Sequence, residues 1–476
     1  MIAMRWTMRL LGLISTVVVA RLLAPSDYGV VAIAMIAVGL LETIAYLGVD
    51  LSLIKDQSAG HDEFDSAWTI QLIQGIAIST LLYFSAPWVA IYFNEPRAHN
   101  VILWLSLRPI IDSLQNIGLV ALRRDLDFAR EFRFNLLTKI LGVCVQITAA
   151  LYFRNYWSLV MGMVAASVIT STLSYLMHPY RPRLTLTKAA SIWSFSQWLL
   201  VSRVGSFFNR RADEFVVGRL SGTSAMGGYH VVNEIATMPT NEIIMPMRRA
   251  LYPALARIAT AKSAYQRMVV DSLRASAVIC VGLGFGLACV SDLVVPLVLG
   301  DKWLSTVPVM RWLALFGVSA SLSSVLEVPL WVAGRTRLSA ILNWIELALV
   351  IPIILTATQI WGVEGAAASR FLVSLAILPL TCILVGQACE ISLRMLASAL
   401  YRPLISGLAL TAAMVAIGRP EPMSLLLILL LKVTAGALAY MGTTWALWRR
   451  AGRPEGVEAS AFAAVSQLWL AFFRRR

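Results

Sequence analysis

Apolar runs long enough to cross a lipid bilayer recur along almost the whole chain, and only short links separate them. A helix needs about 20 such residues to span the hydrocarbon core, where its backbone polar groups must be satisfied internally. The composition agrees, since 58% of the 476 residues are hydrophobic and 14% are charged, against about 25% charged in soluble domains. We therefore expect an all-α, polytopic membrane protein.

The apolar runs divide into two groups of six and a final pair, which predicts about 14 transmembrane helices. We expect an N-terminal six-helix lobe at 1–188, a C-terminal six-helix lobe at 189–390, an extra helix pair at 391–450, and a cytoplasmic amphipathic, basic tail at 451–476. The predicted spans are 8–24, 27–48, 67–93, 101–122, 134–153, 156–177, 191–212, 226–247, 270–299, 305–333, 338–360, 362–387, 402–418 and 423–447. Polar residues weaken the first, seventh and eighth of these, so the choice between 12 and 14 spans stays open.

Basic residues predict the orientation of these helices. The net charge is +14, and the Lys and Arg residues sit mostly in the links between apolar runs. If the N-terminus is cytoplasmic, about 25 of them lie in cytoplasmic segments and about 6 in periplasmic ones, which is the asymmetry of integral membrane proteins. We therefore expect a multi-pass protein of the bacterial inner membrane with both termini in the cytoplasm, and no nucleic-acid partner.

Residues that carry enzyme or metal chemistry form no recognisable group in the sequence. The five cysteines lie inside apolar runs without C-x-x-C spacing, and the four histidines are scattered. The sequence also lacks the phosphate-binding loop of an ATPase. We expect no catalytic residue, no metal site and no cofactor.

A short repeated pattern indicates two related halves. Val18-Val19-Ala20-Arg21-Leu22 precedes Gly29 by the same interval as Val216-Val217-Gly218-Arg219-Leu220 precedes Gly227. Both copies join the first span of a half to its second, and the same frame aligns Arg5 with Arg203. Paired halves are common in transporters, because a site at their interface can open alternately to each side of the membrane.

Four stretches resemble motifs of the bacterial polysaccharide-export flippases, a family of the multidrug/oligosaccharidyl-lipid/polysaccharide superfamily. The resemblance is greatest to the colanic-acid and O-antigen exporters, and it covers roughly residues 10–390. In chain order the stretches are Ala20-Arg21-Leu22-Leu23-Ala24-Pro25-Ser26-Asp27-Tyr28-Gly29, Leu122-Arg123-Arg124-Asp125-Leu126-Asp127-Phe128, Ala212-Asp213-Glu214-Phe215-Val216-Val217-Gly218-Arg219 and Met247-Arg248-Arg249-Ala250-Leu251-Tyr252-Pro253-Ala254-Leu255.

The resemblance implies two six-helix lobes packed in a V around a cation-lined cavity that opens alternately to the two sides. It implies that the chain flips undecaprenyl-diphosphate-linked oligosaccharide units to the periplasmic leaflet for exopolysaccharide, capsule or O-antigen (lipopolysaccharide) synthesis. The expected partners are this lipid-linked substrate and membrane lipids, with the polymerase and the export machinery as further candidates.

Charged residues inside the predicted spans supply the candidate site. A diphosphate crosses hydrocarbon only if cations compensate its charge, and the planar arginine fork suits phosphate. Arg203 and Arg210 are seven residues apart, on one face of the seventh span, whereas Arg108 and Asp112 are at the spacing of an internal ion pair. The substrate-binding candidates are Arg203, Arg210, Arg108, Arg311, Arg370 and Arg5. The ion-coupling candidates are Glu42, Asp112, Glu234, Glu327 and Glu346.

Two other classes of protein remain alternatives at this stage. A multidrug or cation antiporter of the same superfamily is expected to have an acidic cavity, whereas the charged residues in these spans are mostly basic. A membrane enzyme of polysaccharide synthesis is expected to have a catalytic constellation or a large periplasmic loop, and neither is recognisable.

Overall fold

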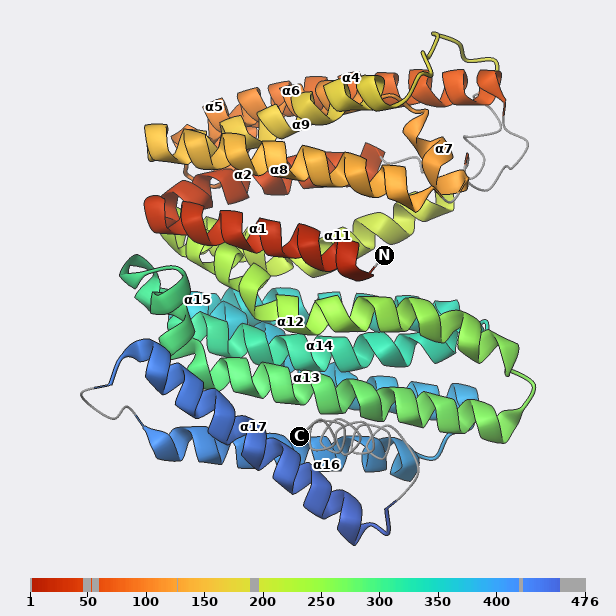
Figure 1. The fold of residues 1–476 in the computed structure, drawn as a ribbon, viewed down its shortest axis with the longest axis vertical. Coiled ribbons are helices and arrows are strands. Elements are labelled where there is room, and N and C mark those ends of the chain that lie inside the picture. Colours follow the sequence, from red (N-terminus) through yellow and green to blue (C-terminus); the bar gives the residue numbers. More distant parts are fainter. Residues whose placement is uncertain are drawn as a thin grey trace, which may run out of the picture. The chain divides into compact units, whose positions relative to one another are not determined.

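The computed structural model describes residues 2–45, 53, 60–125, 127–188, 197–418 and 423–453. Every regular element in these ranges is a helix, and each of the predicted spans overlaps one of them (Figure 1). The expected all-α, polytopic fold is therefore confirmed. The predicted amphipathic tail lies almost wholly outside the described residues.

The chain divides into two compact units, Met1–His230 and Val231–Arg476. This division differs from the predicted boundary between 188 and 189, because the helix that follows the link packs with the first unit. The helices of unit 1 are α1 (Ile2–Leu22), α2 (Pro25–Ala45), α4 (His61–Tyr92), α5 (Pro96–Leu105), α6 (Leu107–Ser113), α7 (Leu119–Arg124), α8 (Phe128–Phe153), α9 (Trp157–Met177), α11 (Gln197–Leu220) and the start of α12 (Gly222–Arg257). The assignment of six-helix lobes by the repeat stays a prediction.

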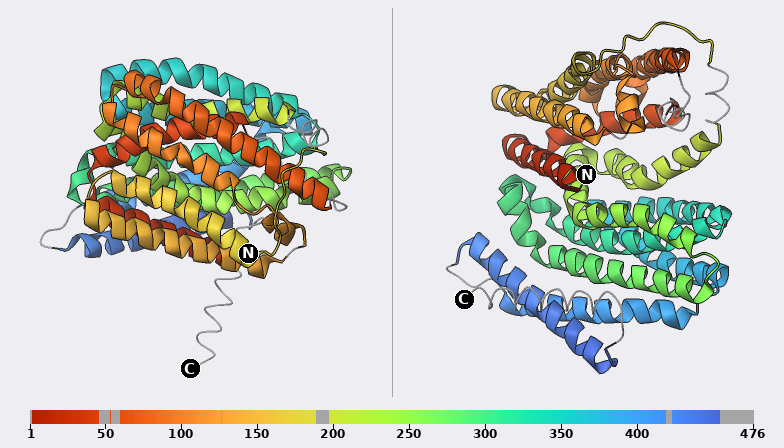
Figure 2. Two further views of the ribbon diagram at one scale, coloured as in Figure 1. Left: turned by 90° about the horizontal axis from the view of Figure 1, so that it is seen from above. Right: turned by 45° about the vertical axis from the view of Figure 1, so that its right-hand side comes forward.

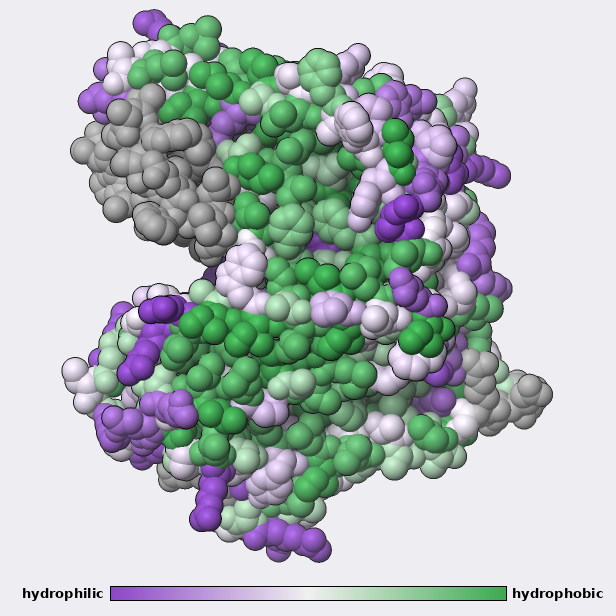
Figure 3. Space-filling model, turned by 180° about the vertical axis from the view of Figure 1, so that it is seen from behind, coloured by the Kyte–Doolittle hydropathy of each residue, from purple (hydrophilic) through white to green (hydrophobic). Residues whose placement is uncertain are grey.

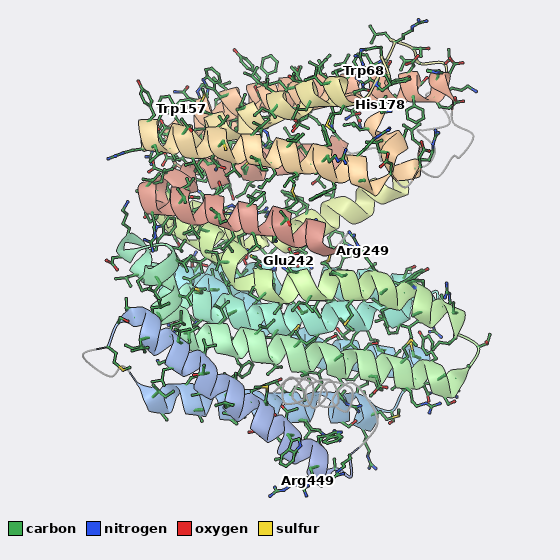
Figure 4. The ribbon with its side chains drawn as sticks, in the orientation of Figure 1. Trp68, Trp157, His178, Glu242, Arg249 and Arg449 are labelled. Atoms are coloured by element: carbon green, nitrogen blue, oxygen red, sulfur yellow. The ribbon has the colours of Figure 1, made fainter. Side chains whose placement is uncertain are left out.

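Unit 1 has two ends, which the turns between its antiparallel helices define. Trp157 at the start of α9 lies at one end, which we call the outer end, whereas His178 and Trp68 lie at the other, inner end (Figure 4). At the inner end the link after α9 runs along the first turns of α4. Buried Asp65 accepts hydrogen bonds there from the Tyr180 hydroxyl and from the Arg183 backbone N–H, the latter at 2.9 Å.

Unit 2 contains the rest of α12 together with α13 (Lys262–Val298), the short η1 (Asp301–Thr306), α14 (Val307–Val332), α15 (Thr336–Cys389), α16 (Leu393–Ile417) and α17 (Leu425–Arg450). Helices α13, α14 and α15 pack in sequence, and α16 packs on both α13 and α17 (Figures 1 and 2). Gly362 breaks α15 into two arms because its φ of 61° and ψ of −145° are not helical. Only glycine adopts this conformation readily.

Nine of the described helices are long and apolar enough to cross a membrane. One of them, α15, holds two predicted spans on either side of Gly362, so these nine helices account for ten of the fourteen predictions. The remaining predictions correspond to α1, α11, α12 and the broken series α5, α6 and α7.

The fourth predicted span, 101–122, is wrong as a single helix. It is divided between α5, α6 and α7, and the first break falls at Ser106. Pro109 explains that break, because it has no N–H to donate to the carbonyl of Leu105 and its ring crowds that carbonyl. The second break covers 114–118, where backbone turns replace the helix.

The surface of unit 2 fits a lipid environment. Apolar residues cover most of the face visible in the lower half of Figure 3, and hydrophilic residues gather towards its edges. Large exposed apolar side chains include Leu408, Val415 and Leu438, each between 63% and 69% exposed. A contiguous apolar surface of this kind is not stable in water and is expected where acyl chains are the solvent.

Candidate functional site

The repeated glycines meet at the outer end of unit 1. A Cβ added at Gly29 would lie 1.8 Å from the carbonyl oxygen of Thr223, and one added at Gly227 would lie 1.8 Å from the carbonyl oxygen of Pro25. The same interval of 198 residues separates Gly29 from Gly227 and Pro25 from Thr223. The contact is thus reciprocal between the two copies, and it brings the backbones of α2 and α12 together where no side chain fits.

Ionic and polar contacts reinforce this crossing. Glu95, just before α5, is buried and accepts two hydrogen bonds of 2.8 Å from the Arg97 guanidinium and one of 2.5 Å from the Thr223 hydroxyl. The bonds from Arg97 hold the pKa of Glu95 at about 2. Asp27 accepts from the backbone N–H groups of Ala24 and Tyr156, which ties α2 to α9. We call Asp27, Glu95, Arg97 and Thr223 the outer latch.

Helix α11 turns a polar face towards the start of α12. Glu214, only 1% exposed, accepts hydrogen bonds of 2.5 and 2.6 Å from Arg211 and lies 3.3 Å from Nδ1 of His230. Asp213, equally buried, accepts a 2.6 Å hydrogen bond from the Tyr229 hydroxyl. These contacts anchor α11 to the first turns of α12 within unit 1.

Three predicted cations lie on α1 and α11. Arg210 is exposed on α11, three and four residues before Asp213 and Glu214 and so on the same side of the helix. The side chains of Arg203 and Arg5 lie outside the described part of the chain, so their role stays a prediction.

Arg108 reaches into the middle of unit 1 from α6. Its Nη2 lies 3.8 Å from Asp112 Oδ2, its Nε donates to Ser167 on α9, and its Nη1 donates to the sulfur of Met35 on α2. The predicted Arg108–Asp112 pair is therefore present. Glu42 is exposed two turns along α2 from Met35 and so lies on the same helical face.

A second arginine–carboxylate pair lies in unit 2. Arg248 Nη2 on α12 is 3.5 Å from Glu327 Oε2 on α14, and the Arg248 guanidinium lies 5.0 Å from the centre of the Trp331 ring. Both charged side chains are about one-fifth exposed. Of the other predicted acids, Glu234 is exposed on α12 and Glu346 is partly buried on α15.

The last two predicted cations occupy different surroundings in unit 2. Arg370 is buried on α15, and its guanidinium lies 4.6 Å from the centre of the Phe316 ring. Arg311 is exposed near the start of α14 and donates from Nε to Ser291 at 3.2 Å. Among the candidates whose side chains are described, the structure brings Arg108 together with Asp112 and Glu327 together with Arg248, but it does not gather these residues into one cluster within either unit.

Comparison with known proteins identifies the family. Residues 18–308, more than half of the chain, match the family model described as polysaccharide biosynthesis protein. The chain belongs to this polysaccharide biosynthesis protein family. Over 373 residues it is 23% identical to the lipopolysaccharide biosynthesis protein WzxC of Escherichia coli (strain K12), a match that covers 77% of this chain and 75% of that protein.

Two further similarities extend this result. The succinoglycan biosynthesis transport protein ExoT of Rhizobium meliloti (strain 1021) is 22% identical over 307 residues, which cover 64% of this chain and 62% of that protein. The inward closed conformation of the lipid II flippase MurJ superposes with a TM-score of 0.77 at 13% identity, over 95% of this chain and 99% of that one. The family member therefore has the fold of a membrane flippase.

Sequence reasoning missed Arg248 and the pair of Glu214 with His230. Arg248 follows the predicted eighth span at 226–247, but α12 continues to Arg257 and carries it against Glu327 on α14. Glu214 lies just beyond the predicted seventh span at 191–212, and a carboxylate inside a helix of this length signals a nearby cation. The signal for His230 is weaker, because its contact crosses the turn between two helices.

Proposed function

We propose that this family member flips undecaprenyl-diphosphate-linked oligosaccharide repeat units from the cytoplasmic to the periplasmic leaflet of the bacterial inner membrane. The observation that carries the proposal is the family match together with a flippase fold over 95% of the chain. Transport in polysaccharide synthesis, as in the name of ExoT, is the activity that such a chain of membrane helices suits. The protein is then a transporter and not an enzyme.

Arginine–carboxylate pairs suit the capture and release of a diphosphate. In the pairs Arg108–Asp112 and Arg248–Glu327, the carboxylate keeps the arginine charge compensated while no cargo is bound. An incoming diphosphate competes with the carboxylate for the guanidinium, because a planar carboxylate and a tetrahedral phosphate group can each accept a pair of hydrogen bonds from arginine. The arginine of each pair is therefore compensated both with and without cargo, and the displaced carboxylate must be neutralised when cargo binds.

Protonation of the carboxylate offers a route to ion coupling. A proton on Glu327 removes its negative charge and frees Arg248 for the diphosphate, so that proton binding and cargo binding favour each other. Release of the proton restores the pair and expels the cargo. Glu42, Asp112, Glu234 and Glu346 remain further candidates for the same role.

The outer latch suits alternating access. In the conformation described here it joins α12 to α2 and α5 at the outer end of unit 1. With both termini in the cytoplasm this end is periplasmic, so opening to the periplasm requires the latch to separate. The latch consists of polar bonds and a close backbone contact.

Loss of the protein tests the proposed function directly. A deletion strain should keep synthesising the lipid-linked repeat unit and accumulate it on the cytoplasmic face, which a membrane-impermeant sugar-modifying reagent applied to sealed vesicles can measure. A strain that stops synthesising the unit would instead identify an enzyme and overturn the proposal.

The cargo contacts are tested by arginine substitutions in the complemented strain. Arg210→Ala should abolish export while membrane abundance stays near normal, and Arg210→Lys should rescue only partly because lysine lacks the planar fork. Arg337→Ala, an exposed arginine at the start of α15, is the matched control and should export normally. Normal export by Arg203→Ala/Arg210→Ala would remove both residues from the pathway and leave the predicted Arg108, Arg311 and Arg370, together with Arg248, as the candidates.

A further inference from the structure

A cavity of about 540 Å³ lies in unit 2 between α13, α14, α15 and α16. Its size is in the range of cavities that hold small ligands. The charged and polar side chains in its wall are Arg311, Trp312, Glu364 and Thr411, and the rest of the wall is mainly apolar. The arginine–carboxylate pairs described above do not contribute to it.

The cavity lies close to the turns that end the helices of unit 2. Arg311 is four residues after the start of α14, and Glu364 is two residues after the break at Gly362. Thr411 and Val415 belong to the last two turns of α16, which ends at Ile417. A residue this close to a helix end is at the depth of lipid headgroups, where a tryptophan such as Trp312 is also typical.

The wall carries a cation and an anion that do not neutralise each other. Arg311 donates from Nε to Ser291, and within the described part of the chain its two Nη groups have no protein partner. Glu364 accepts a 3.2 Å hydrogen bond from Trp312 Nε1. The described ion pairs within 4.0 Å do not include Arg311 with Glu364. A ligand with separated positive and negative charges can therefore span them.

The open side of the cavity is apolar. Leu408 and Val415, on the α16 side of the wall, are 63% and 67% exposed. In a membrane protein such side chains face acyl chains, so the polar part of the cavity continues into a lipid-facing surface. A ligand that combines a zwitterionic head with apolar chains matches both parts.

We propose that this cavity binds the headgroup of a phospholipid that carries a phosphate and a primary ammonium, namely phosphatidylethanolamine. Arg311 binds the phosphate, and Glu364 accepts hydrogen bonds from the ammonium, which the indole N–H of Trp312 helps to orient. A phosphatidylglycerol headgroup is negatively charged and has no ammonium, so it repels the Glu364 carboxylate. A choline headgroup has no N–H group to donate to that carboxylate. Arg311, which the sequence predicts as a substrate-binding residue, binds a lipid headgroup in this proposal, and the inference does not rest on the transport activity.

The proposal is tested by lipid binding to the purified full chain, measured by native mass spectrometry. The probes are phosphatidylethanolamine, phosphatidylcholine and phosphatidylglycerol with identical acyl chains. Wild-type protein should bind the ethanolamine lipid most tightly, and Arg311→Ala and Glu364→Gln should each weaken that binding by about tenfold, as expected for loss of one charged hydrogen bond. Glu364→Gln should also improve binding of phosphatidylglycerol, because the repulsion is gone.

Two control variants each remove one charge, an arginine or a glutamate, near other helix ends of unit 2. Arg337→Ala and Glu390→Gln should leave the order of the three lipids and their affinities unchanged. Equal binding of the three lipids by wild-type protein, preference for phosphatidylglycerol, or a preference that survives both Arg311→Ala and Glu364→Gln would each overturn the site. Retention of the folded state is checked separately by the thermal unfolding temperature of each variant in detergent.

Discussion

Replacing the Glu214 carboxylate by a neutral amide of the same size should destabilise unit 1. It is 1% exposed and receives Arg211 and His230, so Glu214→Gln leaves two donors facing a neutral amide. Loss of hydrogen bonds to a buried charged group costs about 1–3 kcal/mol, and we expect lower membrane abundance and a lower unfolding temperature. Replacing Arg211 by glutamine in the same chain should restore part of the loss.

A matched control separates this effect from the loss of any carboxylate. Glu390 pairs with Lys262 at the surface, and both side chains are about two-thirds exposed. Glu390→Gln should therefore leave the unfolding temperature almost unchanged, because water screens an exposed pair. Equal effects of Glu214→Gln and Glu390→Gln would show that the Glu214 contacts contribute little to folding.

For single residues, the spacing of charges along one helix predicted one ion pair, but it could not predict the ion pairs that join different helices. The Arg108–Asp112 pair follows from two charges four residues apart on a helix. The contacts of Glu214 with His230 and of Arg248 with Glu327 join residues 16 and 79 positions apart. Such pairs depend on how helices pack, and a single sequence holds no periodic signal for the partner of a charge on another helix.

At the scale of elements, the pH dependence of the outer latch follows from Glu95. Its pKa falls from 4.5 to about 2, chiefly through the Arg97 hydrogen bonds, and solvent screening reduces the stabilisation that follows because the Arg97 side chain is 44% exposed. Because the pKa is depressed in the folded state, this stabilisation is fully present above pH 4.5 and is lost as the pH falls towards 2. The unfolding temperatures of wild type and Glu95→Gln should differ by a constant amount from pH 8 to pH 5.5 and converge only below pH 4.5.

The crossing of α2 and α12 makes a second prediction at this scale. Gly29→Ala and Gly227→Ala place a methyl group 1.8 Å from a carbonyl oxygen, so the two helices must move apart. Overpacking of this kind costs about 1–3 kcal/mol, and it should lower the unfolding temperature and weaken the latch. Gly286→Ala is the matched control, because its methyl group meets nothing within 4 Å in α13 and alanine is the better helix former. Equal stability of all three variants would contradict the close contact.

The sequence predicts where helices form, but it does not predict where a helix breaks or continues. Every predicted span overlaps a helix because about 20 apolar residues have no other stable structure in lipid. The fourth span is nevertheless broken, and α12 runs through Pro239, Pro246 and Pro253 as one helix of 36 residues. Proline lowers the stability of a helix, but the packing of neighbouring helices decides whether the helix breaks or continues.

At the scale of the whole molecule, the short repeat was more informative than its length suggests. The pattern that aligned Gly29 with Gly227 also aligned Pro25 with Thr223, and these four residues form the reciprocal contact of α2 and α12. Glycine is required at both places for the same steric reason, which is why the pattern was visible in the sequence. The grouping of the cargo residues had no such signature, because charges that meet a flexible ligand need no fixed spacing.

The orientation of the whole chain is the remaining prediction, and the distribution of basic residues decides it. About 25 Lys and Arg residues lie on the side of the chain termini and about 6 on the other, so both termini should be cytoplasmic. A reporter that is active only in the periplasm should give a signal when fused within 94–100, between α4 and α5, and none when fused after Gly452. A fusion after Gly418, between α16 and α17, should again give a signal, which tests the extra helix pair separately from the first twelve spans. A periplasmic signal at Gly452 would contradict the fourteen-span topology, and the outer latch would then need a different place in the transport cycle.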